Sequence, residues 1–192
     1  DFIKTKFFEE SELNFAENCL LKNDESDAII FYSENNSRRA ISWKKLREDV
    51  FKVSNFFITN NINKGDRVAA VLPNLPETVI SFLATAQIGA IWSACSSDFG
   101  EKAIIDRFKQ IEPKILIVTD YYYYNNKKIN TTRIISEITK NIPSIKKIIV
   151  VPYENEKANL NEKFDYVEWF SIIKSNKQYK IFEKFNFNHP IY

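Results

Sequence analysis

Apolar and polar residues alternate in blocks along the middle of the chain, and the blocks predict strands and helices in turn. The run at 67–73 is apolar after its first residue, as is typical of a strand buried on both faces, and largely apolar runs at 90–95, 113–120 and 146–152 also predict strands. Apolar residues spaced three or four positions apart predict helices over 43–61, 76–88, 100–111 and 131–142. Because strands and helices alternate with short connections, the sequence predicts an α/β fold: a mostly parallel sheet with helices on both faces.

The ends of the predicted helices carry residues with known preferences. Ser42 is a good N-cap for the first long helix, and Pro76 suits the first turn of the second. Gly89 follows the second helix, where a left-handed residue commonly ends a helix. Upstream, the β-branched and aromatic run at 27–33 predicts a strand that turns and returns as a hairpin.

The pattern divides the chain into three parts. Residues 1–27 are expected to form an irregular leading segment with short helical pieces, and residues 28–152 the α/β subdomain. Residues 153–192 are expected to form a connection containing a polar loop (153–163), a short helix (166–173) and an extended end (182–192).

The composition fits one folded domain of ordinary size. The chain has 192 residues, 44% of them hydrophobic, which is enough for a sizeable core. A net charge of +2 argues against nucleic-acid binding, which usually requires a basic surface. We expect a cytoplasmic protein without a membrane segment, because no apolar run approaches the ~20 residues that span a bilayer. Cys19 and Cys95 lie in apolar sequence and are expected to be buried free thiols.

The reactive residues of the chain limit its chemistry. His189 is the one histidine, and no cluster has zinc-ligand spacing, so neither a histidine-based triad nor a multi-histidine metal site is expected. Three glycines make no glycine-rich phosphate loop. Ser93 has no base that would activate it as a nucleophile. The sequence therefore predicts neither a catalytic residue nor a metal ligand within this chain.

Three loops that follow predicted strands are candidates for ligand binding, because open α/β sheets bind ligands at the carboxyl ends of their strands. These loops are "PNLPE" at 73–77, "CSSDFG" at 95–100 and "TDYYYYNNKK" at 119–128. If the three strands are neighbours, the loops lie together at one edge of the sheet.

The sequence around these loops resembles the acyl-adenylate-forming enzymes, and within them the acetoacetyl-CoA synthetases. The most specific similarity is "GDRVAAVLPNLPETVISFLATAQIGAIWSACSSDFG" at 65–100, followed by "DRFKQIEPK" at 106–114. The segments "LNFAEN" at 13–18, "YYYYNNKKI" at 121–129 and "NHPIY" at 188–192 also resemble parts of that family. The resemblance implies that the chain is the N-terminal subdomain of this enzyme fold.

The resemblance also implies a reaction and its ligands. A carboxylate attacks the α-phosphate of ATP and releases pyrophosphate, and the CoA thiol then displaces AMP from the acyl-adenylate. ATP, CoA and Mg²⁺ are the implied cofactors. In the family, the phosphate loop, the metal ligand and the catalytic lysine all follow the matched region. We therefore expect this chain alone to be inactive, to bind none of these ligands tightly, and to work with the rest of its own polypeptide and small-molecule substrates.

Four residues match positions along the CoA channel of the family, and a fifth candidate lies beside one of them. Ser96, Ser97 and Asp98 match the loop along the pantetheine arm, and Lys127, with Lys128 beside it, matches a basic position near the 3′-phosphate. Each assignment has a structural alternative. Asp98 is also placed to cap the following helix, and the two lysines are also typical of solvated loop residues.

The chain departs from the family pattern within two of these loops. The family has proline at the position of Ser97, arginine at Tyr123 and glycine at Asn126. Asparagine tolerates a left-handed backbone, so the turn at Asn126 is expected to keep its shape. The arginine at position 123 would have been a phosphate donor, and tyrosine does not replace it.

Two other functions remain open on the sequence. One is a different short-chain acyl-CoA synthetase, acting on acetate or propionate. The other is a stand-alone α/β interaction module without ligase activity. The sequence leaves the oligomeric state open.

Overall fold

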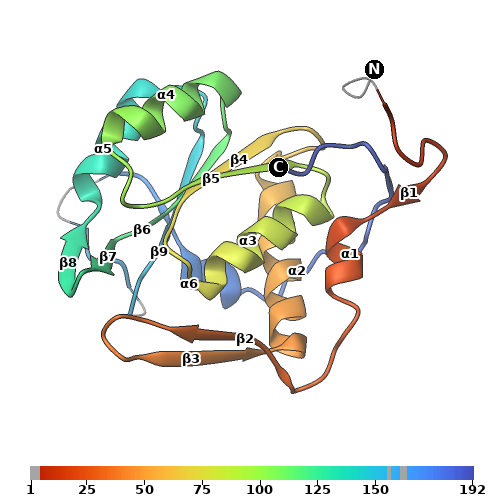
Figure 1. The fold of residues 1–192 in the computed structure, drawn as a ribbon, viewed down its shortest axis with the longest axis horizontal. Helices are drawn as coiled ribbons and strands as arrows, with labels where there is room; N and C mark the ends of the chain where they lie inside the picture. Colours follow the sequence, from red (N-terminus) through yellow and green to blue (C-terminus); the bar gives the residue numbers. More distant parts are fainter. Residues whose placement is uncertain (1–4, 155–156, 161–163) are drawn as a thin grey trace.

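The computed structural model describes residues 5–154, 157–160 and 164–192. Residues 1–4 of the expected leading segment, and 155–156 and 161–163 of the expected polar loop, lie outside the described residues. The centre of the structure is a five-stranded parallel sheet in the order β10-β9-β6-β4-β5, which confirms the predicted parallel sheet (Figure 1). Its strands are β4 (Arg67–Val71), β5 (Ile91–Cys95), β6 (Ile115–Thr119), β9 (Lys147–Val151) and β10 (Val167–Glu168).

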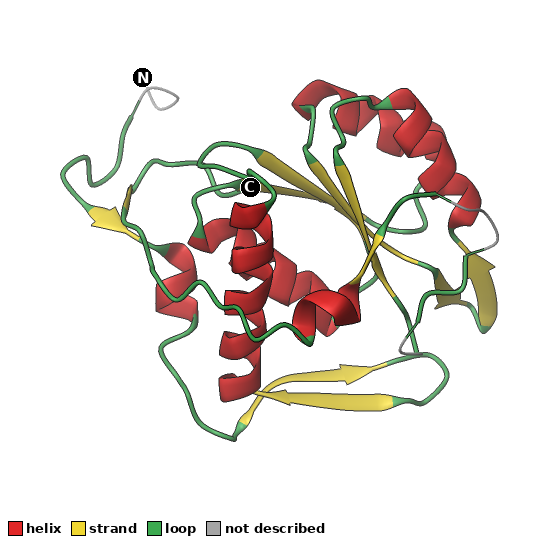
Figure 2. Cartoon of the chain, turned by 180° about the vertical axis from the view of Figure 1, so that it is seen from behind, coloured by secondary structure: helices red, strands yellow, loops and turns green. Residues whose placement is uncertain are grey.

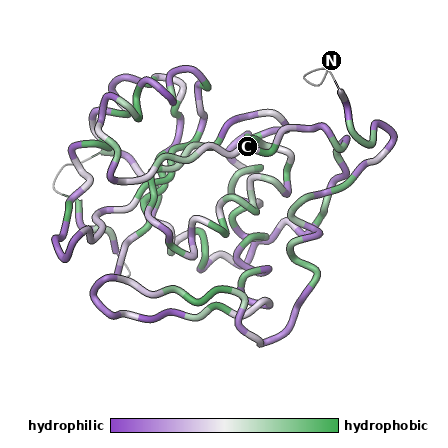
Figure 3. The backbone as a smooth tube through the Cα atoms, in the orientation of Figure 1, coloured by the Kyte–Doolittle hydropathy of each residue, from purple (hydrophilic) through white to green (hydrophobic). Residues whose placement is uncertain are grey.

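Helices cover both faces of the sheet, as predicted. Successive residues of each strand point to opposite faces, so Ala70 joins one hydrophobic core and Ala69 the other. The central strands are largely green in Figure 3, in agreement with burial on both faces. One face packs against α2 (Trp43–Thr59), α3 (Pro76–Gln87) and α6 (Trp169–Ile173), and the other against α4 (Glu101–Ile111) and α5 (Thr132–Asn141) (Figures 1 and 2).

The strand order explains which helix lies on which face. From β4 the chain crosses through α3 to β5, and it then returns through α4 to β6, on the other side of β4. Parallel crossovers are right-handed, so a reversal in the direction of travel moves the crossover helix to the opposite face. The reversal also creates a switch point between β4 and β6, where loops diverge and ligands commonly bind.

The predicted helix ends are confirmed. Ser42 Oγ accepts a hydrogen bond from the backbone N–H of Lys45 at 3.2 Å, and Pro76 is the first residue of α3. Gly89 has a φ of +70°, so it adopts the left-handed backbone just past the end of α3.

The C-terminal part of the chain differs from the prediction in one element. The helix predicted over 166–173 begins only at Trp169, because Val167 and Glu168 pair with β9 as a further parallel strand. A two-residue strand has no periodicity that a sequence pattern would detect. The expected extended end and leading segment meet as a short antiparallel pair, β1 (Glu12–Leu13) with β11 (Phe185–Asn186), and α1 (Phe15–Cys19) follows β1.

Two β-hairpins lie outside the central sheet. The first, β2 (Asp27–Tyr32) with β3 (Arg38–Ser42), confirms the predicted hairpin. The second, β7 (Tyr121–Tyr124) with β8 (Lys127–Asn130), stands where the sequence predicted a loop at 119–128. Aromatic residues favour strands, so the tyrosine run pairs with the residues beyond the turn instead of remaining irregular.

The turn of this second hairpin has a conformation that only a few residue types accept. Asn125 and Asn126 have φ of 51° and 59°, the left-handed pair typical of two-residue hairpin turns. We expect Asn126→Ala to lower the free energy of unfolding by about 1 kcal/mol, because alanine disfavours this backbone region. Asn126→Gly is expected to leave stability unchanged. Urea denaturation measures both, and equal stability of the two variants would contradict a left-handed turn.

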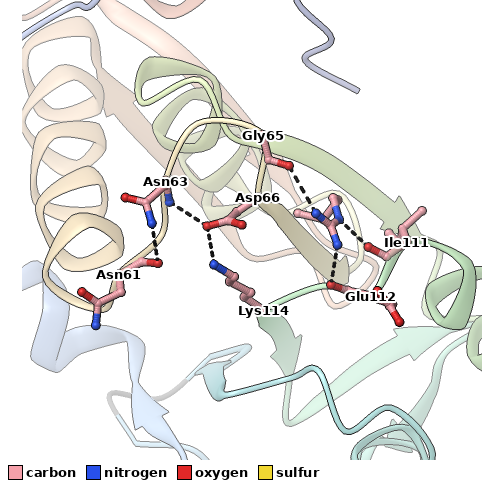
Figure 4. Close-up of polar contacts among 8 residues, drawn as sticks. Asn61, Asn63, Gly65, Asp66, Ile111, Glu112 and Lys114 are labelled. Carbon is pink, nitrogen blue, oxygen red and sulfur yellow. Dashed lines mark hydrogen bonds and ion pairs between the residues drawn. The ribbon is translucent and has the colours of Figure 1, made fainter.

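Asp66 and Arg67, at the start of β4, hold the edge of the sheet where the strands begin (Figure 4). Asp66 accepts hydrogen bonds from a backbone N–H of the preceding loop at 2.8 Å and from Lys114 Nζ at 2.7 Å. The guanidinium of Arg67 donates to the carbonyl oxygens of Ile111 and Glu112, where α4 ends. Asp66 and Arg67 of the "GDRV" motif therefore join β4 to the α4–β6 connection, at the edge away from the candidate loops.

Two further expectations concern thiols and membranes. Both cysteines are free, and Cys95 is buried as predicted, whereas Cys19 is only half-buried. Within the described part of the chain, no helix combines the length and the apolar character that crossing a membrane requires.

Candidate functional site

A cavity of about 400 Å³ lies at the carboxyl ends of β4 and β5, beside the switch point. Each of the three predicted loops contributes to it, and β4 is hydrogen-bonded to both β5 and β6, so the loops do share one edge of the sheet. The lining comes from the residues after β4, from the end of β5 and the residues after it, from β7, from α3 and from the last residue: Leu72, Pro73, Asn74, Thr78, Ala94, Cys95, Ser96, Ser97, Asp98, Tyr122, Tyr123, Tyr124 and Tyr192.

Hydrogen bonds within the loops hold two walls of the cavity in place. Thr78 Oγ1 donates to the carbonyl oxygen of Pro73 at 2.9 Å and so ties the loop after β4 to α3. The backbone N–H of Phe99 donates to the carbonyl oxygen of Ser96 at 3.2 Å and closes the turn after β5. Both walls are therefore formed by local contacts that need no ligand.

Asp98 does not cap the helix that follows it, and this correction changes its interpretation. The N-cap of α4 is Gly100, and no side chain caps this helix. Asp98 stands two residues before the N-cap, too early for its carboxylate to reach the first free amides of the helix. Asp98 is exposed and lines the cavity, as does the exposed Ser96, while Ser97 between them is buried.

The cavity lining is almost free of charge. Asp98 is an acid, and no lysine, arginine or histidine is among the lining residues. Burial raises the pKa of the Cys95 thiol, and burial followed by the charge of Asp98 raises the pKa of Tyr122. Both groups therefore stay protonated at neutral pH, and Cys95 is not an activated nucleophile. The lining suits an uncharged polar ligand better than a phosphate.

Lys127 and Lys128 lie on β8, and neither lines this cavity. Lys128 Nζ is 3.5 Å from the centre of the Tyr121 ring, which is a cation–π contact. Lys127 is exposed and pairs with Tyr124 next to the hairpin turn. Lys128 pairs with Tyr123, and because Tyr123 and Tyr124 both line the cavity, both lysines lie near its rim. Lys128 differs in that it also packs on the buried ring of Tyr121.

The segment at 119–128 was predicted to bear on a ligand, but its tyrosines were not predicted to form a paired strand. Tyr122, Tyr123 and Tyr124 line the cavity, and Tyr121 is buried beneath them. A signal was present, since four strand-forming aromatic residues directly precede an Asn-Asn turn. Tyr192 carries no such signal, because only the tertiary structure brings the C-terminal segment beside β5, where Trp92 N donates to the carbonyl oxygen of Ile191 at 3.0 Å.

A second cavity, of about 570 Å³, lies next to the first, between the N-terminal ends of α4 and α5. Ser97, Asp98 and Tyr122 line both cavities and so form the wall between them. The second cavity also contains Arg133, which is paired with Glu101 at 3.0 Å.

Comparison with known families identifies the fold to which these loops belong. The pattern described as "AMP-binding enzyme" matches residues 16–181, which is most of the chain. The chain belongs to the AMP-binding enzyme family. The resemblance inferred from 65–100 and 106–114 is therefore confirmed, and the candidate cavity is a feature of an AMP-binding enzyme.

Curated relatives of this chain are named acetoacetyl-CoA synthetases. The chain is 38% identical over 197 residues to acetoacetyl-coenzyme A synthetase of Rhizobium meliloti (strain 1021), covering 99% of this chain and 29% of the relative. It is 37% identical over 198 residues to acetoacetyl-CoA synthetase of Xenopus tropicalis, covering 97% and 29%. The chain thus spans 29% of the length of each of these relatives.

Solved structures agree with this assignment of the fold. Acetoacetyl-CoA synthetase from Streptomyces lividans matches with a TM-score of 0.85 and 29% identity, over 94% of this chain and 28% of that one. An acyl-CoA synthetase of Brucella canis matches with a TM-score of 0.71 at 18% identity, which is a likeness of fold alone. The expected N-terminal subdomain of an acyl-CoA synthetase fold is confirmed.

Proposed function

We propose that this chain is the N-terminal part of an AMP-forming ligase that converts acetoacetate, ATP and CoA into acetoacetyl-CoA, AMP and pyrophosphate. The observation that carries the proposal is the similarity to acetoacetyl-CoA synthetases, at 38% and 37% identity over nearly the whole chain. We place the reaction in the cytoplasm, where both ATP and CoA are available.

Among the described residues, no group of three or more histidine, cysteine, aspartate or glutamate side chains is arranged to hold a metal ion. The family resemblance implies that Mg²⁺ and the triphosphate of ATP are bound by segments that follow the matched region, and we assign them there. This chain then contributes the shape of a binding channel, and the chemical steps take place on residues outside it.

Within that enzyme we assign the cavity of about 400 Å³ to the pantetheine arm of CoA. The arm is uncharged and carries amide and hydroxyl groups, which match a lining of hydroxyl, amide and aromatic groups without a cation. Ser96 and Ser97 are placed to exchange hydrogen bonds with the arm, and the tyrosines of β7 offer it apolar ring surface. Asp98 would repel the phosphates of CoA, so we place these outside the cavity, toward Lys127.

The choice of substrate is tested by pyrophosphate release from the complete polypeptide that contains this chain. We expect the highest kcat/KM with acetoacetate, compared with acetate and propionate. A preference for acetate or propionate would place the chain in another short-chain acyl-CoA synthetase. No release with any of the three acids would favour a stand-alone interaction module.

The phosphate role of Lys127 gives a second expected result. Lys127→Ala should raise the KM for CoA about tenfold or more, since a hydrogen bond to a charged group contributes about 1.5–3 kcal/mol. Lys109→Ala is the matched control, because it removes the same charge from an exposed residue in the last turn of α4 that lines neither cavity. Dephospho-CoA, which lacks the 3′-phosphate, should show little difference between Lys127→Ala and the parent enzyme. An unchanged KM for CoA in Lys127→Ala would reject the phosphate role.

A further inference from the structure

The β2–β3 hairpin contacts two walls of the cavity, although none of its residues lines it. The hairpin lies apart from the central sheet, along the lower edge of the molecule in Figure 1. One contact joins β3 to the start of α3, and another joins the turn of the hairpin to the tyrosine hairpin β7–β8.

Arg39 on β3 holds the wall that follows β4. Its two terminal nitrogens donate to the two carboxylate oxygens of Glu77 at 2.7 and 3.0 Å, which makes a bidentate pair. Glu77 lies in the first turn of α3, directly after the loop that lines the cavity, and its side chain is 7% exposed. The guanidinium also lies 5.1 Å from the centre of the Phe31 ring. A pair of this geometry fixes both the distance and the orientation of the two elements.

The turn of the same hairpin holds the tyrosine wall. Glu34 Oε2 accepts a hydrogen bond from the backbone N–H of Asn126 at 2.9 Å. Next to it, Asn35 Nδ2 donates to Glu154 Oε1, and Glu154 Oε2 accepts from the hydroxyl of Tyr121 at 2.7 Å. The turn of β2–β3 is therefore joined to the turn of β7–β8 directly and to its first strand through Glu154.

A series of aromatic rings connects Arg39 with the tyrosine strand β7. The ring of Phe31, which lies against Arg39, is 6.5 Å from that of Tyr153. The Tyr153 ring in turn lies 5.4 Å from Tyr121 and 5.6 Å from Tyr123. Because close-packed side chains transmit displacements, a shift of Arg39 is expected to move the tyrosine wall as well.

We infer that the β2–β3 hairpin sets the separation of the two cavity walls, with Arg39 and Glu34 as positioning residues for the ligand. The identity of that ligand, the pantetheine arm, rests on the proposed function, whereas the positioning itself rests on the contacts above. Neither residue touches the ligand; each acts through the wall that it holds.

Affinity for pantetheine, measured by calorimetric titration of the complete polypeptide that contains this chain, tests the inference. Pantetheine is uncharged, so its affinity does not respond directly to a distant change of charge. Arg39→Gln is expected to weaken binding about tenfold, because a small displacement of a binding wall is costly. The control Arg38→Gln should stay within about twofold, because loss of an exposed ion pair has little effect. Among the described residues, Arg38 interacts with Tyr32 and Asp27, both within the same hairpin.

Two substitutions of Glu34 separate the loss of its hydrogen-bond acceptor from the loss of its charge. Glu34→Ala is expected to weaken pantetheine binding about fivefold, because the N–H of Asn126 loses its acceptor. Glu34→Gln keeps a carbonyl oxygen for this N–H and should restore affinity to within about twofold of the parent chain. Parent-like affinity in both Arg39→Gln and Glu34→Ala would overturn the inference.

Amide hydrogen exchange provides a readout that does not depend on the ligand. In Arg39→Gln, exchange is expected to quicken together at 73–78 and at 121–127, but to remain unchanged in Arg38→Gln. Faster exchange confined to 73–78 would overturn the positioning role. If the parent chain fails to bind pantetheine, the proposed ligand is wrong. In that case, faster exchange at both walls in Arg39→Gln would still support the positioning role, and faster exchange at one wall alone would still overturn it.

Discussion

Replacing Asp120 with alanine is expected to lower the free energy of unfolding by about 3–5 kcal/mol, the largest effect predicted for this chain. Asp120 directly follows β6 and is fully buried. Its Oδ1 accepts hydrogen bonds from the backbone N–H groups of Tyr121 and Tyr153 at 3.0 and 2.9 Å. Its Oδ2 accepts from the N–H of Asn159 at 2.9 Å. Alanine would leave three donors without this acceptor, and each buried donor without a partner costs about 1–3 kcal/mol.

Two further variants separate the loss of the acceptor from the loss of charge. Asp120→Asn keeps one carbonyl oxygen but turns an NH₂ group toward a backbone N–H, so an intermediate loss of about 2 kcal/mol is expected. Asp106→Asn makes the same change at an exposed residue of α4, where an effect within about 0.5 kcal/mol is expected. Urea denaturation of the three variants measures these differences. A loss below 1 kcal/mol for Asp120→Ala would show that the three amides find other acceptors.

Gly89→Ala is expected to lower the free energy of unfolding by about 2–4 kcal/mol, for two reasons that add. Gly89 has a φ of +70°, and a residue with a Cβ is strained there. The new Cβ would also lie 2.5 Å from Cζ of Phe185, whose ring packs against that of His189 with ring centres 5.1 Å apart. The His189 ring contacts the carbonyl oxygen of Gly89 at 2.8 Å, so the ring of Phe185 has little room to move.

Gly65→Ala is the matched control for this prediction. Gly65 has a φ of +83°, but no atom lies within 4 Å of the position that its Cβ would take. The control therefore carries the backbone strain alone, about 1–2 kcal/mol. The difference between the two alanine variants in thermal or urea denaturation reports the clash with Phe185. Equal losses at the two positions would contradict a tight contact at Gly89.

The elements that the sequence predicted correctly depend on local rules. β6 is apolar up to its last residue because it is buried on both faces, and the helices show apolar spacing because one side of each faces the sheet. Ser42 and Gly89 act on backbone groups within a few residues of themselves. Such rules operate over one or two helical turns, so a single sequence is enough to apply them.

The errors concern contacts between residues that are distant in sequence, or turns whose exact register matters. The strand at Val167 exists only because β9 offers an edge, and the pairing of β1 with β11 joins the two ends of the described chain. The predicted cap by Asp98 failed by two residues, since the helix begins after Gly100. Capping depends on the position of one residue, and a pattern with a period of 3.6 residues does not locate it.

The sequence alone determined that this chain is an α/β protein of the AMP-binding family and which three loops bear on its site. This was possible because burial patterns and family motifs consist of residues that lie close together in the sequence. Only the tertiary structure decided that Ser96, Ser97 and Asp98 share a cavity with the tyrosine strand while Lys127 and Lys128 do not line it. It also joined the β2–β3 hairpin to two walls of that cavity. These contacts depend on how segments distant in sequence pack together. Hydrophobic burial favours compact packing in general, whereas the fit between particular side chains decides which segments meet.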